Sequence, residues 1–149
     1  CYFSFVYAKC DPRARGLLWL ELESFDAGDV AWMVGGDFNA ILDVFKKKGR
    51  GVFSWRDQKD FAFFVSKCRL LDLGFSGDKF TWSNNQRGTQ RTWCRIDCCF
   101  GNLQAVSSFP NVCVMHLSRS ISDHSPLRIN MEASNLGSGS FFFSNRWAS

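Results

Sequence analysis

The order of apolar and polar positions predicts that the chain opens with a strand, a helix and a second strand. Residues 2–8 are rich in aromatic and β-branched side chains, which are typical of strands. Asp11 followed by Pro12 is a common helix start, with Asp as the N-cap, and Gly28 is suited to end that helix. The apolar run at residues 30–34 then predicts a second strand.

The rest of the chain predicts one more long helix and several short strands. From Ser54 or Asp57 to about Leu71, apolar side chains at positions 61, 64, 65 and 68 follow the spacing of one buried helix face. Short strands are expected at residues 71–75, 80–83, 92–96, 112–117 and 127–131, and a short helix at 101–108. Residues 134–140 are rich in Gly and Ser, a composition typical of a linker.

Composition narrows the class of protein. The 149 residues are enough for one domain with its own core, and an aromatic content of 16% favours β-rich packing. The net charge of +4 is compatible with a polyanionic partner without requiring one. No apolar segment reaches the roughly 18 residues of a membrane span, and no secretion signal is visible, so we expect an intracellular protein, with the nucleus as one candidate compartment. The first residue is Cys1 rather than Met, which we interpret as the sign of a fragment.

Seven cysteines raise the question of disulfides or zinc. Without a secretion signal we expect reduced thiols. Cys94, Cys98 and Cys99 with His116 fit no common zinc spacing, so a role as small buried hydrophobic residues is favoured over a metal site.

The first candidate chemistry follows two glycines after the second predicted strand. Asp37 and Asn39 lie two residues apart and share one face of an extended segment, so both should point into one site while Phe38 points into the core. A carboxylate beside an amide suits a hard cation and a phosphate oxygen. The alternative is a turn in which Asp37 and Asn39 act only as turn formers.

Two later segments carry complementary groups. His124 directly follows Asp123 in a predicted loop, and a histidine titrating near neutral pH is suited to accept a proton or to contact a phosphate. Asp97 ends an earlier predicted strand and would hold the imidazole tautomer as a buried carboxylate does. His116 lies inside an apolar strand pattern and is more simply structural.

These motifs, taken in order, resemble a known superfamily. GDFN at 36–39, RID at 95–97 and SDHSPL at 122–127 are similar to the endonuclease/exonuclease/phosphatase superfamily, which includes DNase I, the abasic-site endonucleases and the endonuclease domain of LINE-type retrotransposons. With LDLGF at 71–75 and FTWSN at 80–84 included, the motif sequences most resemble the plant LINE group. The likeness runs from about Phe5 to Trp147, and the motifs are weak singly but strong in this order.

The resemblance implies an α+β protein with a DNase I-like two-sheet β-sandwich flanked by helices, of which this chain would hold the C-terminal half. Residues 1–133 would form a partial endonuclease domain, and residues 134–149 a linker and the start of a segment leading to a reverse transcriptase downstream. The implied function is DNA nicking by metal-dependent phosphodiester hydrolysis, with Mg²⁺ or Mn²⁺ as cofactor and DNA as partner.

The resemblance also implies roles for the polar residues. The residue matching Asp37 acts on the attacking water, the one matching Asn39 binds the phosphate, and the one matching Asp123 lies at the metal site. The residues matching Asp97 and His124 form a carboxylate–imidazole pair.

Further phosphate contacts are expected from five other residues. The positions matching Tyr7 and Thr81 approach the phosphate in relatives, although Tyr7 is alternatively a core aromatic. Lys46, Lys47 and Lys48 form a basic loop that we expect to contact the DNA backbone beside the site; the alternative is a solvated loop.

One departure from the family pattern affects the expected activity. The principal metal ligand of the family is a glutamate, preceded by an asparagine on an earlier strand, and residues 1–7 contain neither. Glu21, Glu23 and Glu132 lie on a predicted helix or beyond the last motif and cannot replace it. We therefore expect little or no nuclease activity from these 149 residues alone. A non-catalytic remnant or nucleic-acid-binding module, and a phosphatase acting on a small phosphate ester, remain alternatives.

Overall fold

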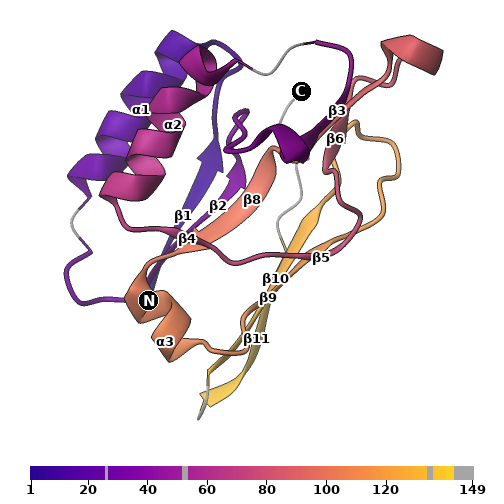
Figure 1. Ribbon diagram of the computed structural model, residues 1–149. Coiled ribbons are helices and arrows are strands. Elements are labelled where there is room, and N and C mark those ends of the chain that lie inside the picture. Colours follow the sequence, from indigo (N-terminus) through magenta and orange to yellow (C-terminus); the bar gives the residue numbers. More distant parts are fainter. Residues whose placement is uncertain (26, 52–53, 134–135, 143–149) are drawn as a thin grey trace.

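The computed structural model describes residues 1–25, 27–51, 54–133 and 136–142, which form a mixed α+β fold (Figure 1). The helices are α1 (Pro12–Ser24), α2 (Trp55–Lys67) and α3 (Leu103–Ser108), with 3₁₀ turns at Val44–Lys46 and Gly88–Gln90. The strands are β1 (Tyr2–Tyr7), β2 (Trp32–Asp37), β3 (Lys47–Gly49), β4 (Leu71–Asp72), β5 (Ser76–Gly77), β6 (Trp82–Ser83), β7 (Thr92–Cys94), β8 (Asp97–Gly101), β9 (Cys113–His116), β10 (Leu127–Ala133) and β11 (Leu136–Phe142).

The first sheet has the strand order β1-β2-β8-β4, and α1 and α2 cover one of its faces (Figure 1). β1 runs parallel to β2, whereas β8 runs antiparallel to it. The layer between helices and sheet is aromatic: Trp19 of α1 stacks on Phe64 of α2 at 5.3 Å and on Phe38 at 6.0 Å. Burial of such rings is the main stabilising contribution in this layer.

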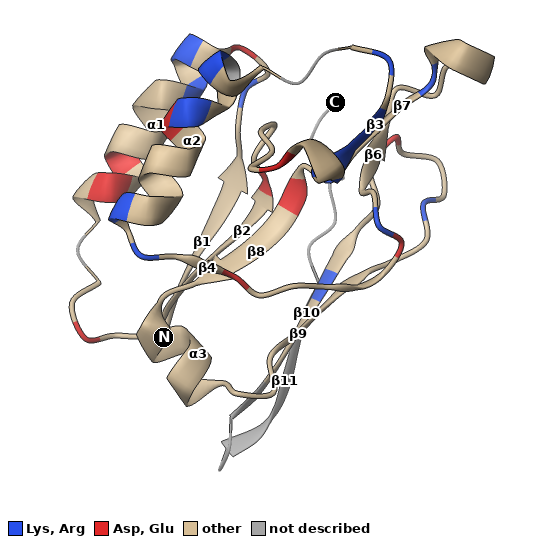
Figure 2. Cartoon of the chain, in the orientation of Figure 1, with Lys and Arg blue, Asp and Glu red and all other residues tan. Residues whose placement is uncertain are grey.

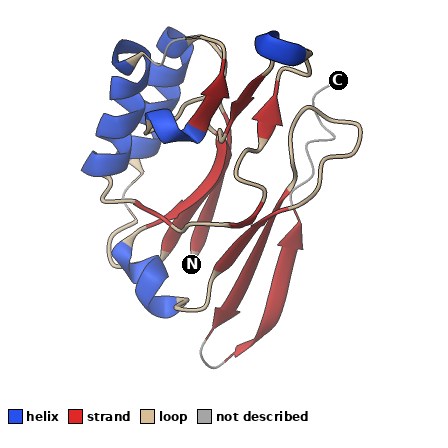
Figure 3. Cartoon of the chain, turned by 45° about the vertical axis from the view of Figure 1, so that its right-hand side comes forward, coloured by secondary structure: helices blue, strands red, loops and turns tan. Residues whose placement is uncertain are grey.

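The second sheet, β11-β10-β9-β5, lies on the opposite side of the first sheet from the helices (Figure 3). Its side chains Val114 and Ile129 form a second core with Met33 of β2 and Cys99 of β8. The neighbouring residue Cys98 belongs to the helix-side core, because successive side chains of a strand point to opposite faces. A third, smaller sheet, β3-β7-β6, continues beyond the end of β2 and β8 (Figure 1).

A glycine sets the close approach of β1 and β2 next to the candidate site. Gly36 has φ of 135°, and a Cβ at this position would lie 2.1 Å from the carbonyl oxygen of Val6. Any other residue would push the two strands apart, so glycine is required immediately before Asp37.

The first predicted helix is confirmed at its start and differs at its end. Asp11 Oδ2 accepts a hydrogen bond of 2.9 Å from the backbone N–H of Ala14, as an N-cap does, and Pro12 begins the helix. The helix ends at Ser24, before Gly28, whose φ of 52° serves the turn into β2 instead. β2 accordingly begins at Trp32 rather than at residue 30.

Three other segments differ from the predicted pattern. Lys46, Lys47 and Lys48 were expected in a loop, but Lys46 ends a 3₁₀ turn, and Lys47 and Lys48 belong to strand β3, which pairs with β7. Asp97 begins β8 rather than ending a strand. Leu136–Phe142, expected within a linker, forms β11 because extended Gly- and Ser-containing backbone pairs with the edge of β10. Residues 134–135 and 143–149 of the expected linker lie outside the described residues.

Two expectations from composition concern the thiols and membranes. All seven cysteines are free thiols, and Cys98 and Cys99 point into different cores, so they cannot share a zinc ion. Over the described ranges, each helix is too short or too polar to cross a bilayer.

Candidate active site

Side chains from three distant segments meet where β2 ends. Asp37 is the last residue of β2 and pairs directly with Asp97, the first residue of β8. His124 comes from the loop between β9 and β10, and one ligand atom of each of these three residues lies within 4.8 Å of the others. Three segments that lie far apart in the sequence therefore bring Asp37, Asp97 and His124 together at one end of the first sheet.

His124 is held by Asp97. Its Nδ1 lies 3.0 Å from Asp97 Oδ2 and 3.2 Å from Oδ1, so Nδ1 carries the proton that faces the carboxylate. Nε2 is the ring nitrogen that Asp97 does not contact. Burial disfavours the imidazolium, but the hydrogen bond and charge of Asp97 outweigh burial and raise the pKa of His124. The loop itself is fixed by a backbone hydrogen bond of 2.6 Å from Ser125 to Thr81.

Asp37 is 3% exposed, and its burial raises its pKa to about 7, with a further contribution from the nearby charge of Asp97. Asn39 stabilises it from two sides: its backbone N–H donates to Oδ1 at 2.8 Å and its Nδ2 to Oδ2 at 3.0 Å. Asn39 adopts a left-handed φ of 45°, and its Nδ2 also donates to Ala8 O at 2.8 Å. Phe38 is fully buried, as the alternation predicts.

Asn39 therefore supports Asp37 in this structure. Both of its amide N–H groups are directed at protein acceptors, and its Oδ1 receives only a weak contact of 3.7 Å from Cys10 Sγ. The structure thus shows Asn39 in a turn that holds Asp37 in place, and the expected contact of Asn39 with a phosphate stays a prediction.

Thr81 lies behind the site rather than in it. Its side chain is fully buried, and its hydroxyl oxygen accepts from the backbone N–H groups of Ile96 at 3.2 Å and Asp97 at 3.1 Å. In this structure the Thr81 hydroxyl fixes the backbone at the start of β8, and the expected contact with a phosphate is not seen, because the hydroxyl is buried and accepts these two backbone hydrogen bonds.

Asp123 and Tyr7 lie at the border of the site. Asp123 Oδ2 accepts a hydrogen bond of 2.9 Å from Trp82 Nε1, and its charge contributes to the raised pKa values of both Asp37 and His124. Tyr7 pairs in register with Asp37 and is 62% exposed, so it is not a core aromatic.

The three lysines expected to act together diverge. Lys46 forms an ion pair of 2.8 Å with Asp72, which also pairs with Arg95. Burial alone would raise the pKa of Asp72, but Lys46 and Arg95 outweigh burial and lower it. Lys47 and Lys48 are successive residues of β3, opposite Cys94 and Trp93 respectively, and therefore point to opposite faces of the small sheet. Strand formation is the reason that the lysines do not present one basic surface.

The donor set at the site is compatible with a divalent cation. Asp37 and Asp97 place two carboxylates close together in a buried position, and their mutual repulsion contributes to the raised pKa of Asp37. A cation would relieve that repulsion, and carboxylate oxygens are the ligands that Mg²⁺ prefers. Asp123 adds a third carboxylate at the border.

Sequence reasoning missed two residues that support this site. Trp82 orients Asp123 through its indole N–H, and Arg119 Nη1 donates to the backbone carbonyl of Asp123 at 3.3 Å. Trp82 stands within the FTWSN stretch, but its partner lies 41 positions away, so only the tertiary fold reveals the contact.

His116 matches its expected structural role. It is 6% exposed, its Nδ1 lies 2.6 Å from Asp78 O, and its ring stacks on Phe75 at 4.4 Å. Burial lowers its pKa, which keeps the imidazole neutral.

No known family model matches the chain, and comparison with curated proteins finds no match. The candidate site therefore rests on the geometry of Asp37, Asp97 and His124.

Proposed function

We propose that this site hydrolyses phosphodiester bonds of DNA with the aid of Mg²⁺ or Mn²⁺. The observation that carries the proposal is the cluster of Asp37, Asp97 and His124, whose ligand atoms lie within 4.8 Å of one another. A histidine oriented by a carboxylate, next to a second carboxylate with a pKa near neutrality, provides the acid–base groups that phosphodiester hydrolysis needs.

The residues divide the work as follows. Asp37, with a pKa of about 7, accepts the proton of the attacking water as the bond from water oxygen to phosphorus forms. The bond from phosphorus to the leaving sugar oxygen breaks in the same displacement, and that oxygen takes a proton from solvent water. His124, whose Nδ1 is hydrogen-bonded to Asp97, donates a hydrogen bond from Nε2 to the phosphate when the imidazole is protonated, a form that Asp97 stabilises by raising the pKa of His124. Asp97 holds the imidazole and stabilises its charge. Asn39 and Thr81 position Asp37 and Asp97 rather than touching substrate.

A divalent cation would be held by Asp123 together with carboxylate oxygens of the cluster, and it would neutralise charge on the phosphate. Asp123 keeps one carboxylate oxygen beyond the one bonded to Trp82.

The fold supports the same proposal at a coarser level. Two facing sheets with helices outside one of them are the arrangement expected of a DNase I-like sandwich. We propose that the chain is part of an endonuclease of the endonuclease/exonuclease/phosphatase superfamily, of the LINE type.

A second candidate function is DNA binding without turnover. The composition of the cluster favours this binding function. Among the described residues, the cluster consists of Asp37, Asp97 and His124 and contains no glutamate. A bound cation would then have fewer strong ligands, and DNA affinity would remain without cleavage.

The proposal is tested with supercoiled plasmid, purified protein in stoichiometric amount and Mg²⁺, against EDTA. Because the chain lacks the glutamate that the resemblance implies as metal ligand, we expect at most slow, EDTA-sensitive nicking, which His124→Ala and Asp97→Asn abolish. Asp29→Asn is the matched carboxylate control, since Asp29 is exposed at the other end of the molecule. Plasmid binding without nicking would replace hydrolysis by the binding function, and cleavage of p-nitrophenyl phosphate without nicking would indicate a phosphatase.

A further inference from the structure

A cavity of about 300 Å³ lies on the small sheet, and basic and aromatic side chains line it. Lys48, Lys79 and Arg119 provide three cations, and Trp93 and Phe80 provide aromatic surface. Figure 2 shows basic residues on β3 and on loops near β6 and β7. One carboxylate, that of Asp78, lines the same cavity, so its charge remains positive.

The three cations of this cavity are not neutralised. Within the described part of the chain, Lys48, Lys79 and Arg119 form no ion pair. Lys46 and Arg95, by contrast, both pair with Asp72. Asp78 offsets one of the three positive charges that line the cavity, the remaining excess of positive charge is repulsive, and an anion would relieve this repulsion.

Aromatic rings hold the cations in place. The guanidinium carbon of Arg119 lies 4.4 Å from the ring centroid of Trp93, and that of Arg91 lies 5.0 Å from the same ring. Lys79 Nζ lies 5.5 Å from the ring centroid of Phe80. Stacking of this kind lowers the entropy that an arginine loses when it binds an anion, and it aims the planar guanidinium at phosphate oxygens.

The cavity adjoins the candidate active site through Asp123. Arg119 donates to the backbone carbonyl of Asp123, and Asp123 precedes His124 in the same loop. On the small sheet, Trp82 binds the Asp123 carboxylate and pairs with Cys94, the neighbour of Trp93.

We propose that this cavity binds a backbone phosphate of the DNA strand, next to the phosphate that lies at Asp37 and His124. The inference rests on the proposed function for the identity of the strand. It assigns phosphate binding to Lys48, Lys79 and Arg119. It excludes Lys46, because that side chain forms an ion pair with Asp72.

The test measures DNA binding in EDTA, where hydrolysis plays no part. Fluorescence anisotropy of a labelled DNA duplex is recorded at several salt concentrations for the wild type and for the triple variant Lys48→Ala, Lys79→Ala and Arg119→Ala. The slope of log affinity against log salt is expected to fall by roughly 0.9 for each phosphate that the variant no longer binds.

The matched control removes three exposed cations elsewhere, with Arg13→Ala, Lys59→Ala and Arg69→Ala. It changes the net charge equally, and its slope is expected to stay close to the wild-type slope. An equal fall in both triple variants would overturn the proposal, because it would show an effect of net charge alone. If the first triple variant does not fold, Lys48→Gln with Lys79→Gln provides the same comparison.

Two further arms separate this inference from hydrolysis and from free phosphate. His124→Ala should bind DNA with an unchanged contribution from the cavity. A wild type that does not nick, or nicking that survives His124→Ala, would refute only the proposed reaction, provided that the slope difference between wild type and cavity variant is retained. An unchanged slope in the cavity variant, with nicking intact, would refute only the cavity. Displacement of DNA by millimolar inorganic phosphate in the wild type but not in the cavity variant would show a site for isolated phosphate instead.

Discussion

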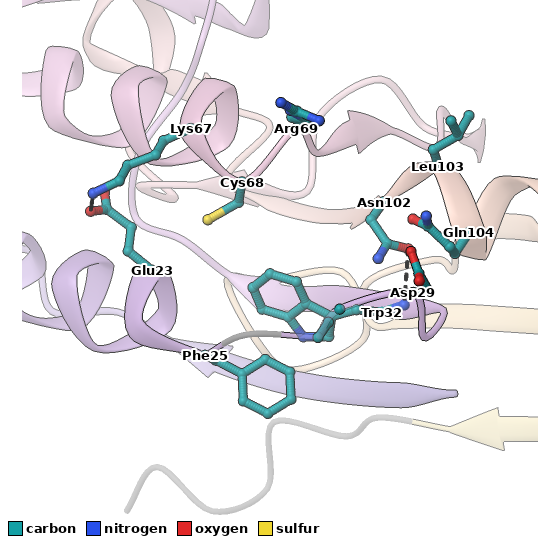
Figure 4. Close-up of a pocket in the computed structure, with 12 residues that line it drawn as sticks. Glu23, Phe25, Asp29, Trp32, Lys67, Cys68, Arg69, Asn102, Leu103 and Gln104 are labelled. Atoms are coloured by element: carbon teal, nitrogen blue, oxygen red, sulfur yellow. Dashed lines mark hydrogen bonds and ion pairs between the residues drawn. The ribbon is translucent and has the colours of Figure 1, made fainter.

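A buried polar side chain lies at each end of strand β2, a neutral one at the start and an ionisable one at the end. At the start, Asn102 Oδ1 accepts from Trp32 N at 3.0 Å and from Ala105 N at 2.9 Å, and its Nδ2 donates to Val30 O at 3.0 Å. Figure 4 shows the bond between Asn102 and Trp32 within a cavity of about 450 Å³. At the other end, Asp37 is buried against a second carboxylate, and its pKa is raised to about 7.

The difference separates polar groups that stabilise the fold from groups that oppose it. Asn102 is neutral and its side chain makes three hydrogen bonds to the backbone, so its burial costs little. Asp37 is hydrogen-bonded too, but its ionised form repels Asp97 in a site with little water. Such strain is typical of functional sites, and the uncharged side chain of Asn102 does not produce it.

The largest expected effect is on catalysis at the Asp37 end. Replacing His124 by Ala removes the hydrogen-bond donor to the phosphate and is expected to lower the nicking rate by roughly 10²–10³-fold. Initial rates of plasmid nicking measure this. A nicking rate of His124→Ala within a factor of two of the wild-type rate would show that the Asp37 end of β2 is not a catalytic site.

Asp37→Asn is expected to stabilise the protein at neutral pH without metal. Because folding raises the pKa of Asp37 from 3.8 to about 7, the stability that it contributes is complete below pH 3.8 and is lost as the pH rises through about 7. The variant lacks this loss, so it should exceed the wild type by up to about 4 kcal/mol at pH 8 and match it near pH 4. Urea unfolding in EDTA at both pH values measures the free energy of unfolding. A variant less stable than the wild type at pH 8 would contradict the prediction.

Asn102→Ala is expected to have the opposite sign. It leaves Trp32 N, Ala105 N and Val30 O without their partner, which should lower the free energy of unfolding by about 2 kcal/mol. The nicking rate of the folded fraction should not change, because Asn102 lies at the far end of β2. Urea unfolding and nicking rates of the same preparation test both parts, and a large loss of rate at full stability would refute the separation.

The smallest effect is expected from Glu23→Gln in the wall of the cavity of Figure 4. Its ion pair with Lys67 spans 3.0 Å, but the lysine side chain is 55% exposed, so water and salt screen the pair. The loss of stability should stay below about 1 kcal/mol and vanish at high salt. A thermal melt with and without 1 M NaCl would show it.

Local patterns predicted the parts of the site that lie close in sequence. Asp37 and Asn39 share a face because they are two residues apart, and Phe38 is buried for the same reason. The pairing of Asp97 with His124 spans 27 positions and came from ordered motifs, not from periodicity.

Contacts set by the tertiary fold were not predictable in this way. Lys46 is bound by Asp72, 26 positions away, and no local pattern distinguishes it from Lys48. Thr81 was expected at the substrate, but the backbone of residues 96 and 97 takes its hydroxyl once β7 and β8 are in place. Helix α1 ends before Gly28 because the chain must turn to reach β2, which is a demand of the sheet and not of the helix.

The adjacent thiols of β8 have a consequence for following the motions of this protein. Cys98 lies in the layer under the helices and Cys99 in the layer between the sheets, and burial raises the pKa of both, that of Cys98 to about 12. Neither thiol reacts with an alkylating reagent while its layer is closed. The labelling rates of Cys98 and Cys99, resolved by mass spectrometry, therefore report separately how often each of the two layers opens. Equal rates would mean that the layers open as one unit, and unequal rates would show which layer loosens first.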